Sequence, residues 1–291
     1  MFLRRTPSFR TLLVLGRVSN LPTAWSNCLA GWWLSGGGNV GKLPFLFLGV
    51  TFLYLGGMYL NDAFDADFDR QHRTKRPIPS GAIAQKDVWK LGVLWLVLGE
   101  MGLLCLGPVA AGLGLVLVLC IVAYDALHKL FTFSPIVMGL CRFLVYLIAA
   151  SAGMGELPGC VIWCGLALGA YVIGLSGLAR KESFRGNVPR WPIWLLCLPM
   201  LLALLINDSF YREGALLRSA VLALWMLYCL RTTFWTRTVN VGRTVSGLLA
   251  GIVIVDWLAA MNVDNTPPEL GLVFLFLFLA ALLLQRFVPA T

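Results

Sequence analysis

The sequence contains 291 residues, of which 59% are hydrophobic and only 13% are charged. Soluble domains carry about 25% charged residues. This composition and a mean hydropathy of +0.81 therefore exclude an ordinary soluble domain and indicate a polytopic membrane protein. The formal net charge is +9. In a membrane protein such an excess is typical of cytoplasmic loops beside an anionic leaflet, so we expect membrane lipids as partners and no nucleic acid.

Ten apolar runs approach the roughly 20 residues that a membrane-spanning helix needs. They lie at 21–36, 44–62, 88–106, 108–124, 134–155, 159–180, 191–206, 215–231, 241–263 and 269–287. The sequence therefore predicts an all-α fold, a polytopic transmembrane helical bundle of nine or ten spans. We expect residues 1–291 to form a single integral-membrane domain.

Lys and Arg gather in the N-terminal segment and in the connections that follow even-numbered spans. Those before the first span and after the second and sixth are Arg4, Arg5, Arg10, Arg17, Arg70, Arg73, Lys75, Arg76, Lys86, Arg180, Lys181, Arg185 and Arg190. Positive charge marks the cytoplasmic side, so we expect a multi-pass protein of the cell (inner) membrane with a cytoplasmic N-terminus. The two long polar segments, a motif loop at 61–87 and a second loop at 180–190, fall on that side, and function is expected there.

Carboxylates are concentrated just after the second predicted span. Four of the fourteen acidic residues of the chain lie within eight positions, at Asp62, Asp65, Asp67 and Asp69. If the helix continues, Asp62, Asp65 and Asp69 share one face with Asn61, whereas Asp67 points elsewhere. Carboxylates on one face repel each other unless a cation lies between them. Oxygen-only ligands suit a hard cation such as Mg²⁺, so the spacing predicts a magnesium site.

Four cations follow these acids directly, at Arg70, Arg73, Lys75 and Arg76. Carboxylates followed by guanidinium and ammonium groups favour a metal-bridged phosphate ester whose charge both groups share. The alternative is a solvated loop of mixed charge that only fixes the membrane topology.

The string Asn61-Asp62-x-x-Asp65-x-x-x-Asp69, followed by Arg76-Pro77-x-Pro79-Ser80-Gly81, resembles the first aspartate-rich motif of the UbiA superfamily of intramembrane prenyltransferases. Within that superfamily the chain looks closest to the UbiA-like subgroup called EboC. The resemblance implies that this motif binds Mg²⁺ and the diphosphate of an isoprenoid donor. It extends to Arg17 and Asn20 before the first span and to Tyr124 and Lys129 after the fourth.

The second aspartate-rich motif of the family is altered here. Glu182 stands for its first carboxylate, but Gly186 occupies the place of the second. Arg180, Lys181 and Arg185 surround Glu182 and would neutralise a diphosphate directly. The alternative is that metal binding is lost and the enzyme is degenerate.

The resemblance implies a membrane prenyltransferase that moves a prenyl group from a polyprenyl diphosphate to a small aromatic or lipid-like acceptor with Mg²⁺. A degenerate UbiA-like accessory or transport protein is the alternative function. The implied catalytic residues are Asp65, Asp69 and Lys129. The implied substrate-binding residues are Arg17, Asn20, Arg73, Arg76, Tyr124, Lys129, Arg180 and Lys181. The implied metal ligands are Asn61, Asp62, Asp65, Asp69 and Glu182.

Three further charged residues fall inside predicted spans, namely Glu100, Arg142 and Asp256. Charged groups at membrane depth are costly, so each is a candidate for function. They are expected either to pair with one another as structural polar links or to line a cavity.

Overall fold

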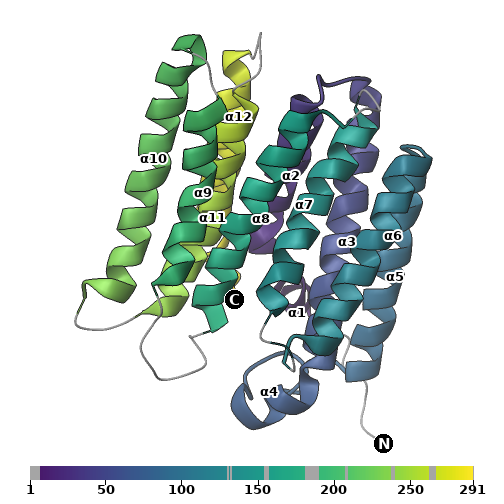
Figure 1. The fold of residues 1–291 in the computed structure, drawn as a ribbon. Coiled ribbons are helices and arrows are strands. Elements are labelled where there is room, and N and C mark those ends of the chain that lie inside the picture. Colours follow the sequence, from purple (N-terminus) through teal and green to yellow (C-terminus); the bar gives the residue numbers. More distant parts are fainter. Residues whose placement is uncertain are drawn as a thin grey trace, which may run out of the picture.

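The computed structural model describes residues 7–129, 131, 133–153, 157–180, 190–206, 209–236, 240–261 and 267–290. Within these residues the regular structure is helical throughout (Figure 1). The short elements are α1 (Phe9–Leu15), η1 (Val18–Asn20), η2 (Val40–Lys42) and α4 (Ala66–His72). The long helices are α2 (Leu21–Leu34), α3 (Leu43–Phe64), α5 (Gln85–Leu104), α6 (Pro108–Leu127), α7 (Ser134–Ala152), α8 (Gly159–Ala179), α9 (Trp191–Ile206), α10 (Ser209–Phe234), α11 (Val241–Ala260) and α12 (Pro268–Leu284).

Each predicted span corresponds to one of the long helices, and the all-helical polytopic bundle is confirmed. Six segments of the described chain are long and apolar enough to cross a membrane, fewer than the nine or ten predicted. They are Val40–Phe64, Pro108–Leu127, Ser134–Ala152, Gly159–Ala179, Arg212–Phe234 and Val241–Ala260. Trp191–Ile206 and Glu269–Leu284 are apolar but shorter. The remaining two long helices are also not among the six. Helix α2 has only 14 residues, and α5 carries charged residues toward both of its ends, such as Lys86 and Glu100.

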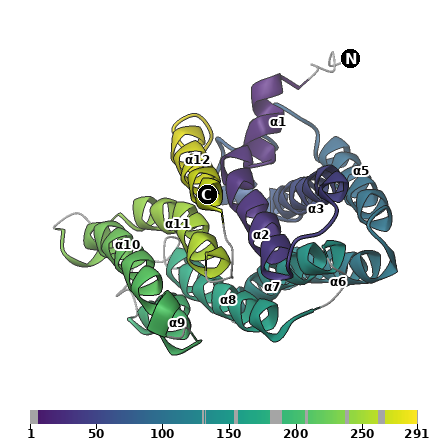
Figure 2. The same ribbon diagram turned by 90° about the horizontal axis from the view of Figure 1, so that it is seen from above.

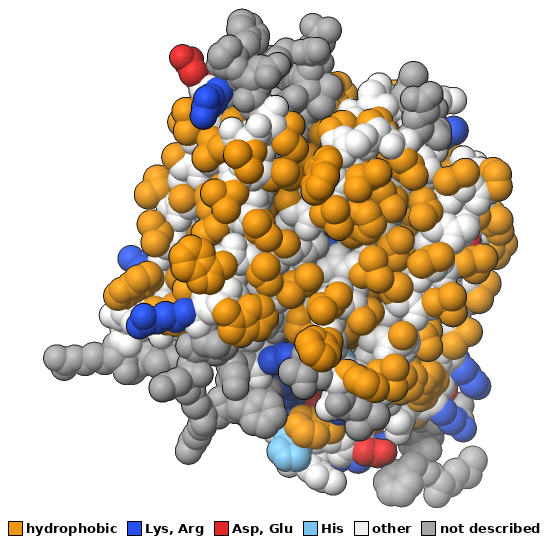
Figure 3. All heavy atoms as spheres, viewed as in Figure 1, with side chains coloured by type: hydrophobic (Ala, Val, Ile, Leu, Met, Phe, Trp, Pro, Cys, Tyr) orange, Lys and Arg blue, Asp and Glu red, His pale blue; other side chains and the backbone are white. Residues whose placement is uncertain are grey.

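Helix α2 lies inside the bundle, where it packs against α3, α7, α11 and α12 (Figure 2). Helices α1 and α4 lie at the same end of the bundle, the lower end in Figure 1. The face in Figure 3 is covered largely by hydrophobic side chains between its two ends. Large apolar residues such as Trp194 and Leu205 are 77% and 83% exposed, as expected of helices that face lipid.

Close packing of α3 against α5 fixes the direction in which α3 reaches the lower end of the bundle. Glycines allow the two backbones to approach, as in many membrane helix pairs. A Cβ atom on Gly99 would lie 2.8 Å from the backbone nitrogen of Leu53, and one on Gly56 would lie 2.6 Å from Leu96 Cδ2. The two helices therefore hold the residues at the end of α3 in a fixed place.

Candidate active site

The carboxylate motif lies at the junction of α3 and α4. The helix of the second span continues through the motif with a break at one residue, because α3 ends at Phe64 and α4 begins at Ala66. The backbone of Asp65 bridges the break: its N–H donates to Asn61 O at 3.0 Å and its carbonyl accepts from the Asp69 N–H at 2.9 Å. This arrangement keeps Asp62, Asp65 and Asp69 buried, with exposed fractions of 6%, 8% and 2%.

Asp67 points away from this group, as the spacing predicted. Its carboxylate forms an exposed ion pair with Arg70, whose guanidinium also donates to Gln85 Oε1 at 2.9 Å. An exposed pair of this kind contributes little to stability. Asp67 therefore belongs to the surface of the loop, although it lies within the same motif.

Arg76 joins two of the buried acids. Its Nη1 atom lies 3.2 Å from Asp62 Oδ1 and 3.0 Å from Asp69 Oδ2. The repulsion expected between neighbouring carboxylates is thus relieved by a guanidinium that follows them in the sequence.

Arg17 approaches the same acids from the segment between α1 and η1. Its Nη2 atom donates to Asn61 Oδ1 at 3.2 Å and to Asp62 Oδ1 at 3.1 Å. Tyr54 on α3 donates to the backbone oxygen of Arg17 at 3.1 Å. Burial lowers the pKa of Arg17, but its electrostatic interactions with neighbouring groups, of which that with Asp62 is the strongest, together outweigh burial and raise the pKa above its ordinary value. Arg17 therefore stays charged at the centre of the site.

Asp65 has different partners, which come from the end of α6. Lys129 Nζ lies 2.6 Å and His128 Nε2 lies 3.4 Å from Asp65 Oδ1. Burial raises the pKa of Asp65, yet its contacts with His128 and Lys129 outweigh burial and lower it below the ordinary value. The same pairing raises the pKa of His128 against the effect of burial. The structure thus brings Lys129, which the family resemblance had implied as a site residue, to the carboxylate motif.

Sequence reasoning missed Asp125 as part of this group. It is 4% exposed, and its Oδ1 accepts a hydrogen bond of 3.0 Å from Asn61 Nδ2. A signal was present in the sequence, since Asp125 directly follows the apolar run at 108–124, and an acidic residue at the edge of a span is costly to bury. Its neighbour Tyr124 stacks on His128 with ring centroids 5.2 Å apart and lies within electrostatic reach of Arg17 and Asp65.

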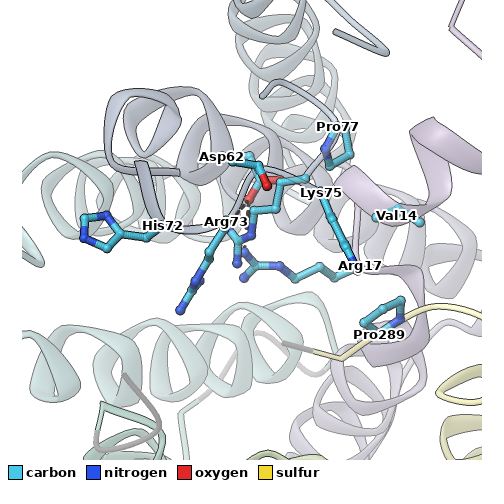
Figure 4. Close-up of a pocket in the computed structure, with 10 residues that line it drawn as sticks. Val14, Arg17, Asp62, His72, Arg73, Lys75, Pro77 and Pro289 are labelled. Atoms are coloured by element: carbon cyan, nitrogen blue, oxygen red, sulfur yellow. Dashed lines mark hydrogen bonds and ion pairs between the residues drawn. The ribbon is translucent and has the colours of Figure 1, made fainter. Parts of the chain in front are cut away.

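A pocket of about 410 Å³ opens beside Arg17 and Asp62. It is lined by Val14, Arg17, Asp62, His72, Arg73, Thr74, Lys75, Arg76, Pro77 and Pro289. Figure 4 shows Arg17 extending toward Asp62 from one side, whereas the side chain of Arg73, which also lines the pocket, points away from Asp62. Four cationic side chains against one carboxylate make this pocket suitable for a polyanion such as a diphosphate.

Other predicted substrate-binding residues are placed differently. Asn20 is buried and donates to the backbone oxygen of Ala290 at 3.0 Å, so it fixes the C-terminal segment beside the pocket. Arg180 donates to Phe131 O at 3.2 Å and to Ser134 Oγ at 3.3 Å, which ties the end of α8 to the start of α7. Lys181 and Glu182 lie outside the described residues.

The donor chemistry of the site fits a hard divalent cation. Asp62 and Asp69 converge on a single cationic atom, and Asp69 Oδ1 and Asp125 Oδ2 are buried without a hydrogen-bond partner among the described residues. In that part of the chain no three Asp, Glu, His or Cys side chains already converge as a ligand set. A metal ion held by Asp62 and Asp69 would therefore compete with Arg76, and one held by Asp65 would compete with Lys129.

The family assignment follows from the sequence around this site. A model of the UbiA prenyltransferase family matches residues 21–203, more than half of the chain, including the whole motif from Asn61 to Gly81. The chain belongs to the UbiA prenyltransferase family. The match concerns the UbiA family as a whole and gives no support to the EboC subgroup.

Curated UbiA relatives match over shorter segments. Digeranylgeranylglyceryl phosphate synthase from Pyrococcus horikoshii is 43% identical over 68 residues, which cover 23% of this chain and 24% of that protein. 4-Hydroxybenzoate octaprenyltransferase from Photobacterium profundum is 29% identical over 139 residues, 47% of each protein. The matches thus span less than half the length of these relatives.

Solved structures of UbiA proteins share the fold over most of the chain. The apo structure of a UbiA homolog from Aeropyrum pernix K1 aligns with a TM-score of 0.66 at 18% identity, covering 84% of this chain and 97% of that one. A UbiA homolog from Archaeoglobus fulgidus bound to DMAPP and Mg²⁺ aligns with a TM-score of 0.54 at 16% identity, covering 94% and 98%. The UbiA fold predicted from the motif is confirmed.

Proposed function

We propose that this protein transfers a prenyl group from a polyprenyl diphosphate to a small aromatic or lipid-like acceptor. The observation that carries the proposal is the buried group of Asn61, Asp62, Asp65 and Asp69 beside a pocket rich in cations. The names of the curated relatives and the homolog bound to DMAPP and Mg²⁺ support the same chemistry. The narrower placement in the EboC subgroup remains a prediction without such support.

Asn61, Asp62, Asp65 and Asp69 are the residues that would hold Mg²⁺, with Glu182 of the second loop as a further predicted ligand. When bound, the ion supplies positive charge that stabilises the departing diphosphate. Within the described residues, Arg17 and Arg76 already contact the acids that would hold the ion. Each of these two cations therefore also lies where it neutralises a diphosphate bound beside those acids.

The pocket cations would stabilise the leaving group. Arg17, Arg73 and Arg76 stabilise the negative charge that develops on the diphosphate oxygen when the allylic C–O bond breaks and the electron pair leaves with that oxygen. The allylic carbon becomes electron-poor, and a nucleophilic atom of the acceptor attacks it and then loses its proton. Apolar helices around the prenyl chain keep water from this carbon.

We also propose that this end of the bundle faces the cytoplasm. The proposal rests on the concentration of Lys and Arg in the segments that meet there, including Arg17, Arg73 and Arg76. A cysteine-labelling experiment with a membrane-impermeant reagent, using an added cysteine in the exposed part of the motif loop, tests this orientation. Labelling of intact cells from outside would contradict it.

Substitution of the buried acids tests prenyl transfer. The protein is incubated with labelled geranylgeranyl diphosphate, Mg²⁺ and a lipid extract. We expect Asp69→Asn and Asp65→Ala to abolish transfer of label into product while membrane insertion is unchanged. Asp67→Asn is the matched control, because Asp67 lies in the same motif but is exposed, and it is expected to retain activity. Transfer that persists in chelator and in both variants of the buried acids would contradict the proposal.

A degenerate accessory or transport protein is the second candidate function. It is favoured by Gly186, which replaces the second carboxylate of the altered motif, and by the side-chain cations that already occupy the described acids. In that case the purified protein would bind geranylgeranyl diphosphate saturably with Mg²⁺ but transfer it to no component of the extract. The same incubation thus distinguishes the two functions.

A further inference from the structure

A network of buried polar side chains joins α2, α7 and α11 at membrane depth. Its centre is Asp256, which is 0% exposed. The two carboxylate oxygens of Asp256 accept hydrogen bonds from Tyr146 at 2.6 Å, from Asn27 Nδ2 at 2.7 Å and from Ser26. Three donors satisfy this carboxyl group, so its side chain is held in one position inside the bundle.

Arg142 stands at the other end of this network. Its Nη1 donates to Asn27 Oδ1 at 2.6 Å and its Nη2 to Thr23 Oγ1 at 3.1 Å. The amide of Asn27 thus lies between the guanidinium and Asp256, and among the described residues no carboxylate forms an ion pair with Arg142. Of the three charged residues predicted inside spans, Arg142 and Asp256 are linked only through this amide. Glu100 pairs with neither, since both of its side-chain oxygens lack a hydrogen-bond partner among the described residues.

The guanidinium of Arg142 has donor capacity to spare. An arginine carries five N–H donors, and two of its nitrogens account for both hydrogen bonds that this side chain makes. The residue is also partly exposed, whereas Thr23, Asn27 and Asp256 are fully buried. A charged group at membrane depth with unused donors is costly unless a ligand completes its shell.

Arg142 lies close to the carboxylate site but deeper in the bundle. Tyr54, which donates to the backbone of Arg17, interacts electrostatically with both Arg17 and Arg142. Thr23 and Asn27 lie three and seven residues beyond Asn20 on α2, which is about 5–10 Å further along the helix axis. A small molecule could therefore contact Arg142 while its other end reaches a prenyl donor at the motif.

We propose that Arg142 binds an anionic group, a carboxylate or a phosphate, of the acceptor molecule. Asn27 and Thr23 position the guanidinium, and Asp256 holds the Asn27 side chain in place from the other side. The spare N–H donors then bind the acceptor's anionic oxygens, so that its nucleophilic atom is directed toward the motif. This inference rests on the proposed prenyl transfer and assigns the acceptor an acidic class.

If the Arg142 network served only as a structural link, substitutions in it would change stability and not the binding of anions. An apolar residue of similar volume in place of a buried ion is often neutral or stabilising, whereas an unpaired charge left behind is strongly destabilising. The double variant Arg142→Met with Asp256→Asn removes both charges together. It therefore separates the loss of anion binding from the loss of folding.

Binding of matched probe pairs tests the assignment. The full chain in non-ionic detergent is titrated with 4-hydroxybenzoate and its methyl ester, and with dodecyl phosphate and dodecanol. We expect the wild type to bind at least one anionic probe about tenfold or more tightly than its neutral partner. Arg142→Met and the double variant should lose this preference, and Arg142→Lys should keep part of it. The pair that shows the preference tells whether the group is a carboxylate or a phosphate.

Binding of geranylgeranyl diphosphate with Mg²⁺ is measured on the same samples as the control, and it should change less than about twofold. The inference is overturned if the wild type shows no preference in either pair, or if the preference persists in Arg142→Met. It is also overturned if the folded double variant loses both kinds of ligand together. Failure of the wild type to bind geranylgeranyl diphosphate would instead contradict the proposed prenyl transfer, and the probe pairs do not depend on it.

Discussion

Nη2 of Arg17 lies 3.1 Å from Oδ1 of Asp62, although 45 residues of sequence separate the two. Arg17 reaches Asp62 from a left-handed backbone conformation with φ of 40°, and it is the only non-glycine residue of the described chain with a positive φ. This conformation costs an ordinary residue about 1–2 kcal/mol. A strained backbone at a buried ion pair indicates that the position serves the site more than the fold.

This strain leads to a prediction that separates stability from activity. Arg17→Gly and Arg17→Ala both remove the contacts with Asn61 and Asp62, so both should lose prenyl transfer. Because glycine adopts positive φ without cost, Arg17→Gly should be more stable than Arg17→Ala by about 1 kcal/mol. Thermal unfolding in detergent measures the difference. Equal stability of the two variants would show that the backbone relaxes once the side chain is gone.

A second prediction concerns the pH dependence of the His128–Asp65 pair. The pKa of His128 is raised in the folded protein, because the contact with Asp65 outweighs burial. The pair therefore stabilises the fold fully below the unfolded pKa of about 6.5, and this contribution is lost as the pH rises through the folded pKa. The lowered pKa of Asp65 keeps its carboxylate charged throughout this window, since its own contribution is lost only at acidic pH.

Comparison of the wild type with His128→Asn tests the direction of this pH dependence. The wild type should exceed His128→Asn in melting temperature most clearly near about pH 5.5, and the difference should shrink by about pH 8.5. The size is expected to be about 1 kcal/mol or less, because the pair is partly solvated. In an Asp65→Asn background the pH dependence of the difference should vanish. A difference that grows with pH would contradict the assignment.

A third prediction tests the packing of α3 on α5. Alanine at Gly99 would place its Cβ 2.8 Å from a backbone nitrogen of α3, which no side-chain rotation relieves. Overpacking of this kind costs about 1–3 kcal/mol, so Gly99→Ala should lower the melting temperature. Gly112→Ala on α6 is the matched control: a Cβ atom at this position would have no neighbour within 4 Å among the described residues, and the substitution should be neutral or slightly stabilising. Equal effects of both substitutions would argue against close contact of the two backbones.

Sequence patterns predicted the helices well because most of the apolar runs contain at most one charged residue and end at polar or glycine- and proline-containing segments. The motif was recognisable for a related reason, since Asp62, Asp65 and Asp69 recur at helical spacing beside Asn61. Partners brought together by tertiary packing were harder to predict. The contact of Lys129 with Asp65 was implied by family resemblance, not by local spacing.

Contacts that depend on helix crossing could not be read from one sequence. Asn20 was assigned to the substrate, yet it holds Ala290, which lies 270 positions away in the chain. Likewise, Arg142 and Asp256 are joined through Asn27 on a third helix. Periodicity shows which face of a helix is polar, but not which other helix meets that face.

The last prediction concerns Asp125, which lies behind Asn61. Its Oδ1 accepts from Asn61 Nδ2 at 3.0 Å, so the Asn61 oxygen is directed toward Arg17 and the other motif residues. Residues that orient a metal ligand in this way typically change metal affinity by about 10–100-fold when replaced. Asp125→Asn has nearly the same shape but loses the charge, and its amide is free to turn either its oxygen or its nitrogen toward Asn61. Asp125→Leu cannot accept a hydrogen bond at all.

We therefore expect Asp125→Leu to require about tenfold or more Mg²⁺ for half-maximal prenyl transfer, with Asp125→Asn between it and the wild type. The measurement is a magnesium titration of transfer at saturating geranylgeranyl diphosphate, with melting temperatures recorded to exclude unfolding. Asp67→Asn again serves as the control, because its exposed carboxylate contacts Arg70 and not Asn61. An unchanged magnesium requirement in folded Asp125→Leu would show that Asn61 is held by Arg17 alone.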